Sequence, residues 1–324
     1  MDFKEYLPQG TPVFLAPMTG ITDAPFRELV SNFGATAVVS EMISSEALVR
    51  LSRKTYKRFI NNNSLKIAQI VGRDPHNMAE SAIISEDLGA NAIDINIGCP
   101  ARKIVSHGSG AALMKNEDLA VKIVEAVVKS VKIPITLKMR LGWDDENINF
   151  SSLAKKFENA GVQMLTIHCR TRNQMYSGKA RWSSIRELSD VIKIPYLCNG
   201  DIRSPEDAAC AMKESNANGI MIGRASLGKP WLLSQIINFL DKKEITPAPS
   251  MEEQFQIVRE HFQAVLNFYG EIQGIRIFRK HFCWYSNKLK GSSIFRETIN
   301  HSEDLSFIKN YVKDFYERQF ETIL

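Results

Sequence analysis

Between residues 13 and 222 the chain repeats one pattern: a short apolar run rich in β-branched residues, a turn, and then a stretch with helical periodicity. Short apolar runs bounded by turn residues are typical of buried parallel strands. We predict strands at Val13–Ala16, Thr36–Ser40, Lys66–Val71, Ala92–Ile97, Pro134–Met139, Met164–His168, Pro195–Cys198 and Gly219–Ile222.

Helix signals lie between most of these runs. Asn116 is a typical N-cap, and apolar residues follow it at four-residue spacing. Ser204 and Pro205 open another helix with acids in its first turn. Alternating strands and helices favour the α/β class and a closed parallel (β/α)8 TIM barrel. An open doubly wound sheet is the rival, but the first strand–helix turn, residues 16–20, lacks the GxGxxG of a dinucleotide site.

The pattern changes near residue 245. Residues 245–250 contain two prolines and resemble a linker, and no strand signal follows them. Helical periodicity predicts three helices, Met251–Tyr269, Gln273–Leu289 and Ser302–Phe320. We therefore expect a barrel domain over residues 1–244 and a small all-α domain over residues 245–324.

Composition restricts the class of protein. The 324 residues are 44% hydrophobic and 24% charged, which suits a globular protein with a sizeable core. No run approaches the ~18 apolar residues of a membrane span, and the acidic start does not resemble a signal peptide. Five cysteines form no CxxC pair and no Cys/His spacing for a metal, so we expect reduced thiols, a cytoplasmic location and no metal.

Polar side chains stand at the carboxyl ends of the predicted strands. In a TIM barrel these ends form one rim, where the chemistry of the fold takes place. The residues concerned are Pro17, Met18, Glu41, Met42, Gln69, Asn96, Cys99, Lys138, Arg140, His168, Arg170, Asn199, Gly200, Asp201, Gly223 and Arg224. An inert barrel does not need such a set, so we predict a functional site at this rim.

Cys99 stands between Gly98 and Pro100, directly after a strand with Asp94 and Asn96 on one face and isoleucines on the other. Proline prevents a helix here, so a tight turn presents one thiol. A functional thiol and an inert turn cysteine are both compatible with this pattern.

Lys138 and His168 end adjacent strands, and a buried lysine needs a carboxylate or another electron-rich partner. The loops after the last two strands contain Asn199-Gly200-Asp201 and Gly223-Arg224, where barrels commonly hold a phosphate. Gln69 offers a donor and an acceptor to a pyrimidine-like ring, and Met18 suits contact with a flat ring. A salt bridge, a core histidine and ordinary turns remain the alternatives.

The helix predicted at Gln273–Leu289 has an apolar stripe and an opposite basic face. Residues 276–296 contain six Lys or Arg and no Asp or Glu. The face includes Arg276, Arg279 and Lys280, and His281 flanks it. Such a face fits binding of a phosphate backbone, or it is only a solvated surface. His281 would either stack on a base or pack against the barrel.

Several motifs together resemble the tRNA-dihydrouridine synthases, most closely the bacterial B-type branch. They are Leu15-Ala-Pro-Met-Thr-Gly-Ile-Thr-Asp23, Asp94-Ile-Asn-Ile-Gly-Cys-Pro100, Lys138-Met-Arg-Leu-Gly-Trp143, His168 with Arg170-Thr-Arg172, Asn199-Gly-Asp201 and Ile222-Gly-Arg-Ala-Ser-Leu-Gly-Lys-Pro-Trp231. Arg279-Lys-His281 with Trp284-Tyr285 is similar to the helical tail of the family. Cys169 departs from the family pattern, which usually has a small residue there, and either fills space or crowds the site.

The resemblance implies FMN as cofactor, NADPH as electron donor and tRNA as substrate of a monomeric enzyme. It assigns FMN to Ala16, Pro17, Met18, Gln69, Lys138, His168, Asn199, Gly200, Asp201, Gly223 and Arg224. It implies hydride delivery to C6 of an extruded uracil, with Cys99 donating a proton to C5. Asn96, Arg170, Arg279, Lys280 and His281 would contact the substrate. Rival functions are an FMN barrel acting on a free small molecule, as dihydroorotate dehydrogenases or enoate reductases do, and a non-catalytic RNA-binding scaffold.

Overall fold

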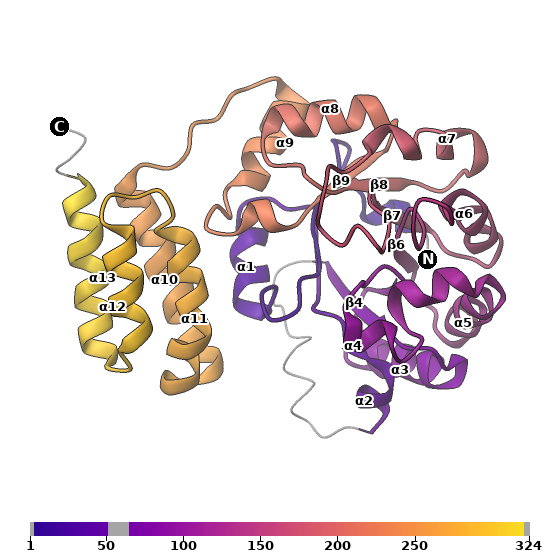
Figure 1. Cartoon of the computed structure of the whole chain (residues 1–324), viewed down its shortest axis with the longest axis horizontal. Helices are drawn as coiled ribbons and strands as arrows, with labels where there is room; N and C mark the ends of the chain where they lie inside the picture. The colour runs from indigo at the N-terminus through magenta and orange to yellow at the C-terminus, as the bar shows by residue number, and fades with distance from the viewer. Residues whose placement is uncertain (1–2, 51–64, 321–324) are drawn as a thin grey trace.

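A computed structural model of the chain describes residues 3–50 and 65–320, and its centre is a closed barrel (Figure 1). Nine strands form one parallel sheet within the described residues. They are β1 (Val13–Leu15), β2 (Ala37–Val39), β3 (Ile43–Ser44), β4 (Lys66–Val71), β5 (Ala92–Asn96), β6 (Ile135–Arg140), β7 (Met164–His168), β8 (Tyr196–Asn199) and β9 (Gly219–Ile222). β2 pairs with both β1 and β4, which closes the ring.

The TIM-barrel prediction is confirmed, and the eight predicted strands match β1, β2 and β4–β9 to within a residue or two at each end. The strand β3 was not predicted; it has two residues and pairs with the end of β4 at Ile70 and Val71. It is too short to show periodicity.

Helices cover the outside of the barrel. They are α1 (Ala24–Asn32), α2 (Ser45–Val49), α3 (Pro75–Asp87), α4 (Arg102–Val105), α5 (Glu117–Ser130), α6 (Phe150–Asn159), α7 (Leu188–Val191), α8 (Pro205–Ser215) and α9 (Leu232–Lys242). Asn116 caps α5 and Ser204 caps α8 through their side chains, as expected. Among the described residues no helix is both long and apolar enough to cross a membrane.

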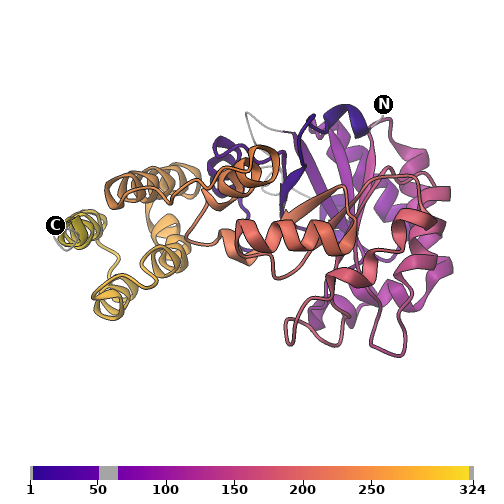
Figure 2. The ribbon, with the colours of Figure 1, turned by 90° about the horizontal axis from the view of Figure 1, so that it is seen from above.

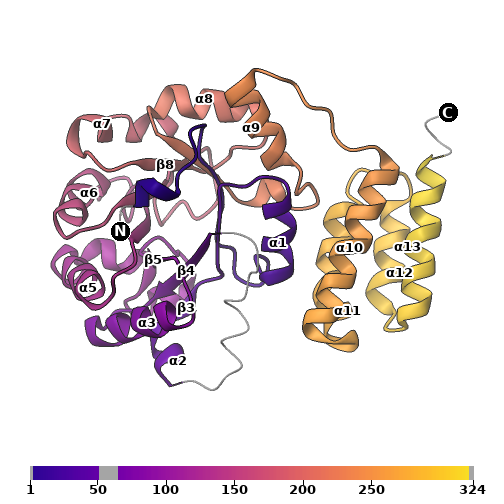
Figure 3. The same ribbon diagram turned by 180° about the vertical axis from the view of Figure 1, so that it is seen from behind.

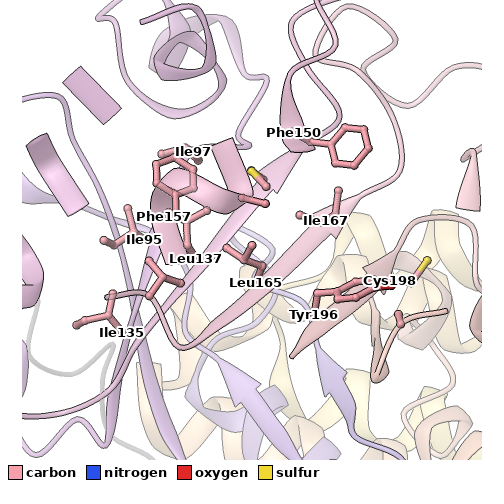
Figure 4. Close-up of a cluster of buried hydrophobic side chains, with 14 of the residues drawn as sticks. Ile95, Ile97, Ile135, Leu137, Phe150, Phe157, Leu165, Ile167, Tyr196 and Cys198 are labelled. Atoms are coloured by element: carbon pink, nitrogen blue, oxygen red, sulfur yellow. The ribbon is translucent and has the colours of Figure 1, made fainter. Parts of the chain in front are cut away.

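The strand alternation separates two layers of core. Ile95, Leu137 and Ile167 point outward and pack with Phe150 and Phe157 of α6 (Figure 4). Inside the barrel a second apolar cluster includes Phe14, Ala92 and Leu197, closed at the amino-terminal end by Phe3 of the turn η1 (Phe3–Tyr6). This turn lies across the barrel in the view from behind (Figure 3). Above the inner cluster the inward positions become polar, which is where the site lies.

Residues 251–320 form four helices beside the barrel (Figure 2). They are α10 (Met251–Tyr269), α11 (Glu271–Tyr285), α12 (Ser292–His301) and α13 (Leu305–Phe320). The sequence analysis predicted three helices here; α12 was missed, α11 ends at Tyr285 instead of Leu289, and α13 starts at Leu305 instead of Ser302. An extended segment from α9 to α10 crosses between the two parts (Figure 1). The division at residue 245 remains a proposal.

The helices α10 and α11 pack against α1 of the barrel, and α12 and α13 lie on their far side (Figure 1). Phe26 of α1 lies against His261 and His281, at 5.5 and 5.6 Å between ring centres. Gly228 meets the backbone of Trp284 so closely that a β-carbon would lie 2.4 Å from the Trp284 carbonyl oxygen. The helical part is therefore fitted to the barrel at specific positions.

Asp23 caps α1 at this junction, and its carboxylate accepts from the amide of Phe26 at 3.0 Å. Burial, with the nearby charge of Glu41, raises the pKa of Asp23 to about 6. The native state therefore binds a proton more tightly than the unfolded state does, and the free energy of unfolding falls as pH rises from about 4 to 6.

We expect Asp23→Asn, which keeps a capping acceptor, to abolish this fall and to stabilise the protein at pH 7 by about 1–3 kcal/mol. Urea unfolding at pH 4.5 and pH 7 measures it. Asp23→Ala, which also loses the cap, is the control. An unchanged difference between the two pH values in Asp23→Asn would contradict the assignment.

Candidate active site

A cavity of about 370 Å³ opens at the carboxyl ends of β1 and β6–β9. This volume lies within the ~300–1,000 Å³ typical of small-molecule sites. Its lining comprises Ala16, Pro17, Met18, Lys138, His168, Tyr176, Asn199, Gly200, Asp201, Ile202, Arg203, Met221, Gly223, Arg224 and Ala225. Ten of the predicted cofactor residues thus surround one cavity, and only Gln69 lies elsewhere.

Lys138 is the cation at the base of the cavity. Its Nζ donates to Oδ1 of Asn199 at 3.1 Å, and Asn199 donates in turn to the Met221 carbonyl oxygen. Burial, and then the charge of Arg140, lowers the pKa of Lys138 to about 8. Lys138 is therefore mostly protonated at pH 7, and its ammonium group can donate a hydrogen bond to an electron-rich ligand.

His168 lies beside Lys138 and is neutral at pH 7. Burial first, and then Arg140 and Lys138, lower the pKa of His168 well below its usual value. Gly200, with φ of 119°, passes so close that a β-carbon would lie 2.9 Å from Cδ2 of the imidazole. A neutral imidazole presents one donor and one acceptor without adding charge.

Arginines gather at one end of the cavity around Asp201. The Asp201 carboxylate accepts from Arg170 and from the amide of Ala180, and lies 3.4 Å from Arg203 and 3.7 Å from Arg224. Burial opposes ionisation, yet the Ala180 amide and Arg170 keep the pKa of Asp201 below its usual value.

One predicted role changes here. Arg170 is 1% exposed and donates to Asp201 and to the carbonyls of Ser177 and Gly178, so it cannot grip a substrate backbone as expected. Asp201, expected among the residues that hold a phosphate, lines the cavity, and its carboxylate orients the guanidinium groups; its contact with a phosphate stays a prediction. Arg203 and Arg224 are both largely exposed and are available to bind an anion.

Cys99 stands on the same rim, in a turn fixed by its neighbours. The Asn96 Oδ1 atom accepts from the amides of Gly98 and Cys99 at 3.0 and 2.9 Å. Arg140 Nε donates to the Gly98 carbonyl at 2.9 Å. The thiol is partly exposed, and burial raises its pKa. Cys99 is not among the residues that line the cavity.

Asn96 and Gln69 were expected to contact a ligand directly. Both are buried, and Nδ2 of Asn96 donates to Oε1 of Gln69 at 2.9 Å. Gln69 Nε2 donates to Asp94 at 2.7 Å. Their amides therefore bond to each other and to Asp94, and a direct contact of either residue with a ligand stays a prediction.

Comparison with known proteins gives the family. The sequence profile of the family "Dihydrouridine synthase (Dus)" matches residues 14–320. The chain belongs to the dihydrouridine synthase family. A "Probable tRNA-dihydrouridine synthase" of Rickettsia bellii is 48% identical over 307 residues, 94% of either chain. The "tRNA-dihydrouridine synthase B" of Pseudomonas aeruginosa is 41% identical, covering 95% of this chain and 93% of that protein.

A solved structure supports the fold of this dihydrouridine synthase family member. The old yellow enzyme homologue of Zymomonas mobilis superposes with a TM-score of 0.51 at 15% identity, over 75% of this chain and 91% of the other. At that identity the likeness concerns the fold alone.

The cavity has the features that FMN would require. Arg203 and Arg224 stand at its charged end, and Gly223 borders it without a side chain. A β-carbon at Gly223 would lie at ordinary contact distance from Cβ of Ala16 (3.7 Å) and Sδ of Met18 (3.8 Å), so the glycine leaves that contact space open. Apolar atoms of Pro17 and Met18 offer a surface for a flat ring beside Lys138. No group of three or more metal-ligating side chains occurs among the described residues.

The predicted basic face of α11 is altered by its neighbours. Arg276 forms an ion pair with Glu303 at 2.9 Å, and Arg279 donates to the Ser302 carbonyl at 2.9 Å. Lys280 reaches across to the Gly20 carbonyl of the barrel.

His281 is 1% exposed and packs among Phe26, His261 and Trp284. The expectation that it touches a substrate is therefore wrong for this structure, and packing against the barrel is the alternative that holds.

Two polar residues that line the cavity, Tyr176 and Arg203, were not predicted from the sequence. Tyr176 is 53% exposed, and the guanidinium carbon of Arg224 lies 4.7 Å from its ring centre. Tyr176 lies within an irregular segment after β7 that has no periodic signal. Arg203 comes after Asp201 and was passed over, whereas Arg140 was noted only as a strand end. Cys169 does not crowd the cavity: it is buried outside the barrel, 3.6 Å from the sulfur of Cys198.

Lys138 makes ligand affinity depend on pH. Because its pKa is about 8, it loses its proton as pH rises from 7 to 9, and an electron-rich ligand loses a charged donor. We expect FMN affinity to fall by roughly tenfold over this range, the effect of one charge-assisted hydrogen bond.

Flavin fluorescence titration of the apoprotein measures this dependence. Lys138→Met should bind FMN more weakly at pH 7 and show no fall, whereas Lys138→Arg should stay charged throughout. A pH-dependent fall that survives in Lys138→Met would assign it to another group.

Proposed function

We propose that this chain reduces uridine in tRNA to 5,6-dihydrouridine, with FMN bound in the barrel cavity and NADPH as electron donor. The observation that carries this proposal is the extent of the family match, which includes both the barrel and the helices up to residue 320. Relatives whose names state tRNA-dihydrouridine synthesis align over more than nine-tenths of the chain. We further propose that this protein acts in the cytoplasm as a monomer.

The residues around the cavity give FMN its place in the proposal. Arg203 and Arg224 would bind its phosphate, and Ala16, Pro17 and Met18 would contact its ring, with Lys138 and His168 at the ring edge. When bound and reduced by NADPH, FMN would supply a hydride. Lys138 presents a positive charge to that ring and is held by Asn199.

Cys99 supplies the proton in this proposal. Because its pKa is raised by burial, the thiol is protonated at neutral pH, as a general acid must be. The thiol would give this proton to C5 of the uracil. The base cannot be reached while it is stacked in folded tRNA, so it must be extruded toward the rim.

A direct test compares substrates. We expect the purified protein to be yellow, to oxidise NADPH with unmodified tRNA, and to leave free uridine and orotate unreduced. Mass mapping of dihydrouridine in tRNA from cells lacking the gene would identify the position. Turnover of the free compounds without tRNA would favour a small-molecule reductase, and absence of flavin would favour an RNA-binding scaffold.

We expect Cys99→Ala to slow tRNA reduction by about 10²–10⁴, the usual contribution of a general acid. FMN content and tRNA affinity should stay unchanged, because Cys99 does not line the cavity. Single-turnover assays measure the rate. Cys210→Ala, at an exposed thiol on α8, is the matched control. A Cys99→Ala enzyme that reduces tRNA at the normal rate would disprove this role.

The basic face of α11 is tested through its ion pair. Glu303 neutralises Arg276 and approaches Arg279 at 3.6 Å. If tRNA lies on this face, Glu303→Gln should strengthen binding and Arg276→Gln should weaken it, each by roughly twofold to fivefold at low salt.

Both effects should fade as salt is raised, because the charges are exposed. Filter binding from 50 to 300 mM salt measures them. Equal affinities for the two variants at low salt would place tRNA elsewhere. Lys280 is left intact in this test because it also contacts the loop that carries Met18.

A further inference from the structure

Residues 17–22, which we call the cavity loop, form a closed turn between β1 and α1. Pro17 and Met18 of this loop line the cavity. The Met18 amide donates to Oγ1 of Thr22 at 2.9 Å, and the Met18 carbonyl accepts from the Thr22 amide at 3.0 Å. Gly20, at the outer corner, has φ of 75°, a left-handed conformation that glycine adopts without strain. Because the turn is closed in this way, a displacement of Gly20 also displaces Met18.

Gly20 is held by two parts of the chain that are far apart in sequence. Its amide donates to the carboxylate of Glu41, which follows β2 and is buried. Its carbonyl accepts from Nζ of Lys280, on α11. Tyr269, the last residue of α10, hydrogen-bonds to Asp23 directly after the loop. The helical part therefore contacts the cavity loop and the residue that follows it.

Lys280 differs from the other cations of α11 in the direction of its contacts. Arg276 forms its ion pair with Glu303, and Arg279 donates to a carbonyl between α12 and α13, so both contact the helical part. Lys280 instead contacts the barrel. Burial lowers the pKa of Lys280, whereas Asp23 and Glu41 favour its charged form. Its charge is thus directed at the junction with the cavity loop.

We propose that Lys280 is a positioning residue through which the docked helical part sets the shape of the cavity loop and so the affinity for FMN. This inference rests on the proposed function, from which it takes FMN as the ligand. Coupling between two sites is reciprocal. If contact with Lys280 favours the loop shape that binds FMN, bound FMN must stabilise the contact with Lys280 by the same factor.

The experiment uses the full-length protein, freed of flavin and then titrated with FMN. Lys280→Met removes the charged donor, and Lys280→Arg keeps one. Lys290→Met is the matched control, because Lys290 is an exposed lysine beyond the end of α11 whose carbonyl contacts Gln319 of α13. It removes the same charge without touching the cavity loop.

We expect the FMN dissociation constant to rise about fivefold to tenfold in Lys280→Met, within the usual range of coupling between two sites. Lys290→Met should leave the constant unchanged. Lys280→Arg should restore most of the affinity, because its guanidinium group still offers charged donors.

Hydrogen exchange locates the effect. Without FMN, the peptide that spans residues 17–23 should exchange faster in Lys280→Met than in wild type, while the β6 peptide, residues 135–140, stays unchanged. A general loss of stability would raise exchange in both peptides. By reciprocity, FMN should slow exchange in the α11 peptide around Lys280 in wild type, and less so in Lys280→Met.

Wild-type FMN affinity and loop exchange in Lys280→Met would overturn the proposal. Weaker tRNA binding with unchanged FMN affinity would also overturn it, and would assign Lys280 to direct contact with the substrate. A wild-type protein that binds no FMN would refute the proposed function. The loop exchange measured without flavin would still show whether Lys280 holds the cavity loop, so the two failures are distinct.

Discussion

The closed ring of parallel strands is the constraint on which the site depends. Closure through β2 and β4 brings every carboxyl end to one rim and turns alternate residues inward. Near the amino-terminal end these residues are apolar and close-packed around Phe14 and Leu197. Toward the rim they are polar, and because water is excluded each must find a partner within the barrel. Most polar side chains of the site therefore hydrogen-bond to one another, and a few donors stay available for a ligand.

Two buried or half-buried acids organise those donors. Asp201 collects Arg170, Arg203 and Arg224 at one side, and Asp94 orients the amides below Cys99. Each fixes the groups that face the ligand or the thiol, which preorganises the site before binding. The cost of burying each acid is offset by several hydrogen bonds to its oxygens.

The sequence predicts the barrel because eight apolar runs recur with helices between them, and it predicts the rim because polar residues follow those runs. It does not reveal which donors are already used. Gln69 and Arg170 have the right chemistry at the right strand ends, yet both already donate to acids of the barrel. Likewise α12 follows Gly291 without a side-chain cap, and burial of Phe295 and Ile299 stabilises it. Tertiary packing, which a local pattern does not contain, decides these cases.

The contact between the helices and the barrel links the tail to the site. Lys280 of α11 donates to the carbonyl of Gly20, whose amide donates to Glu41 at the end of β2. Gly20 is two residues from Met18, which lines the cavity. A cation on α11 and a carboxylate on the barrel thus hold the carbonyl and the amide of one residue in the loop next to the cavity. Because Lys280 is half-buried, with Asp23 and Glu41 nearby, its charge stabilises this junction between the helices and the barrel.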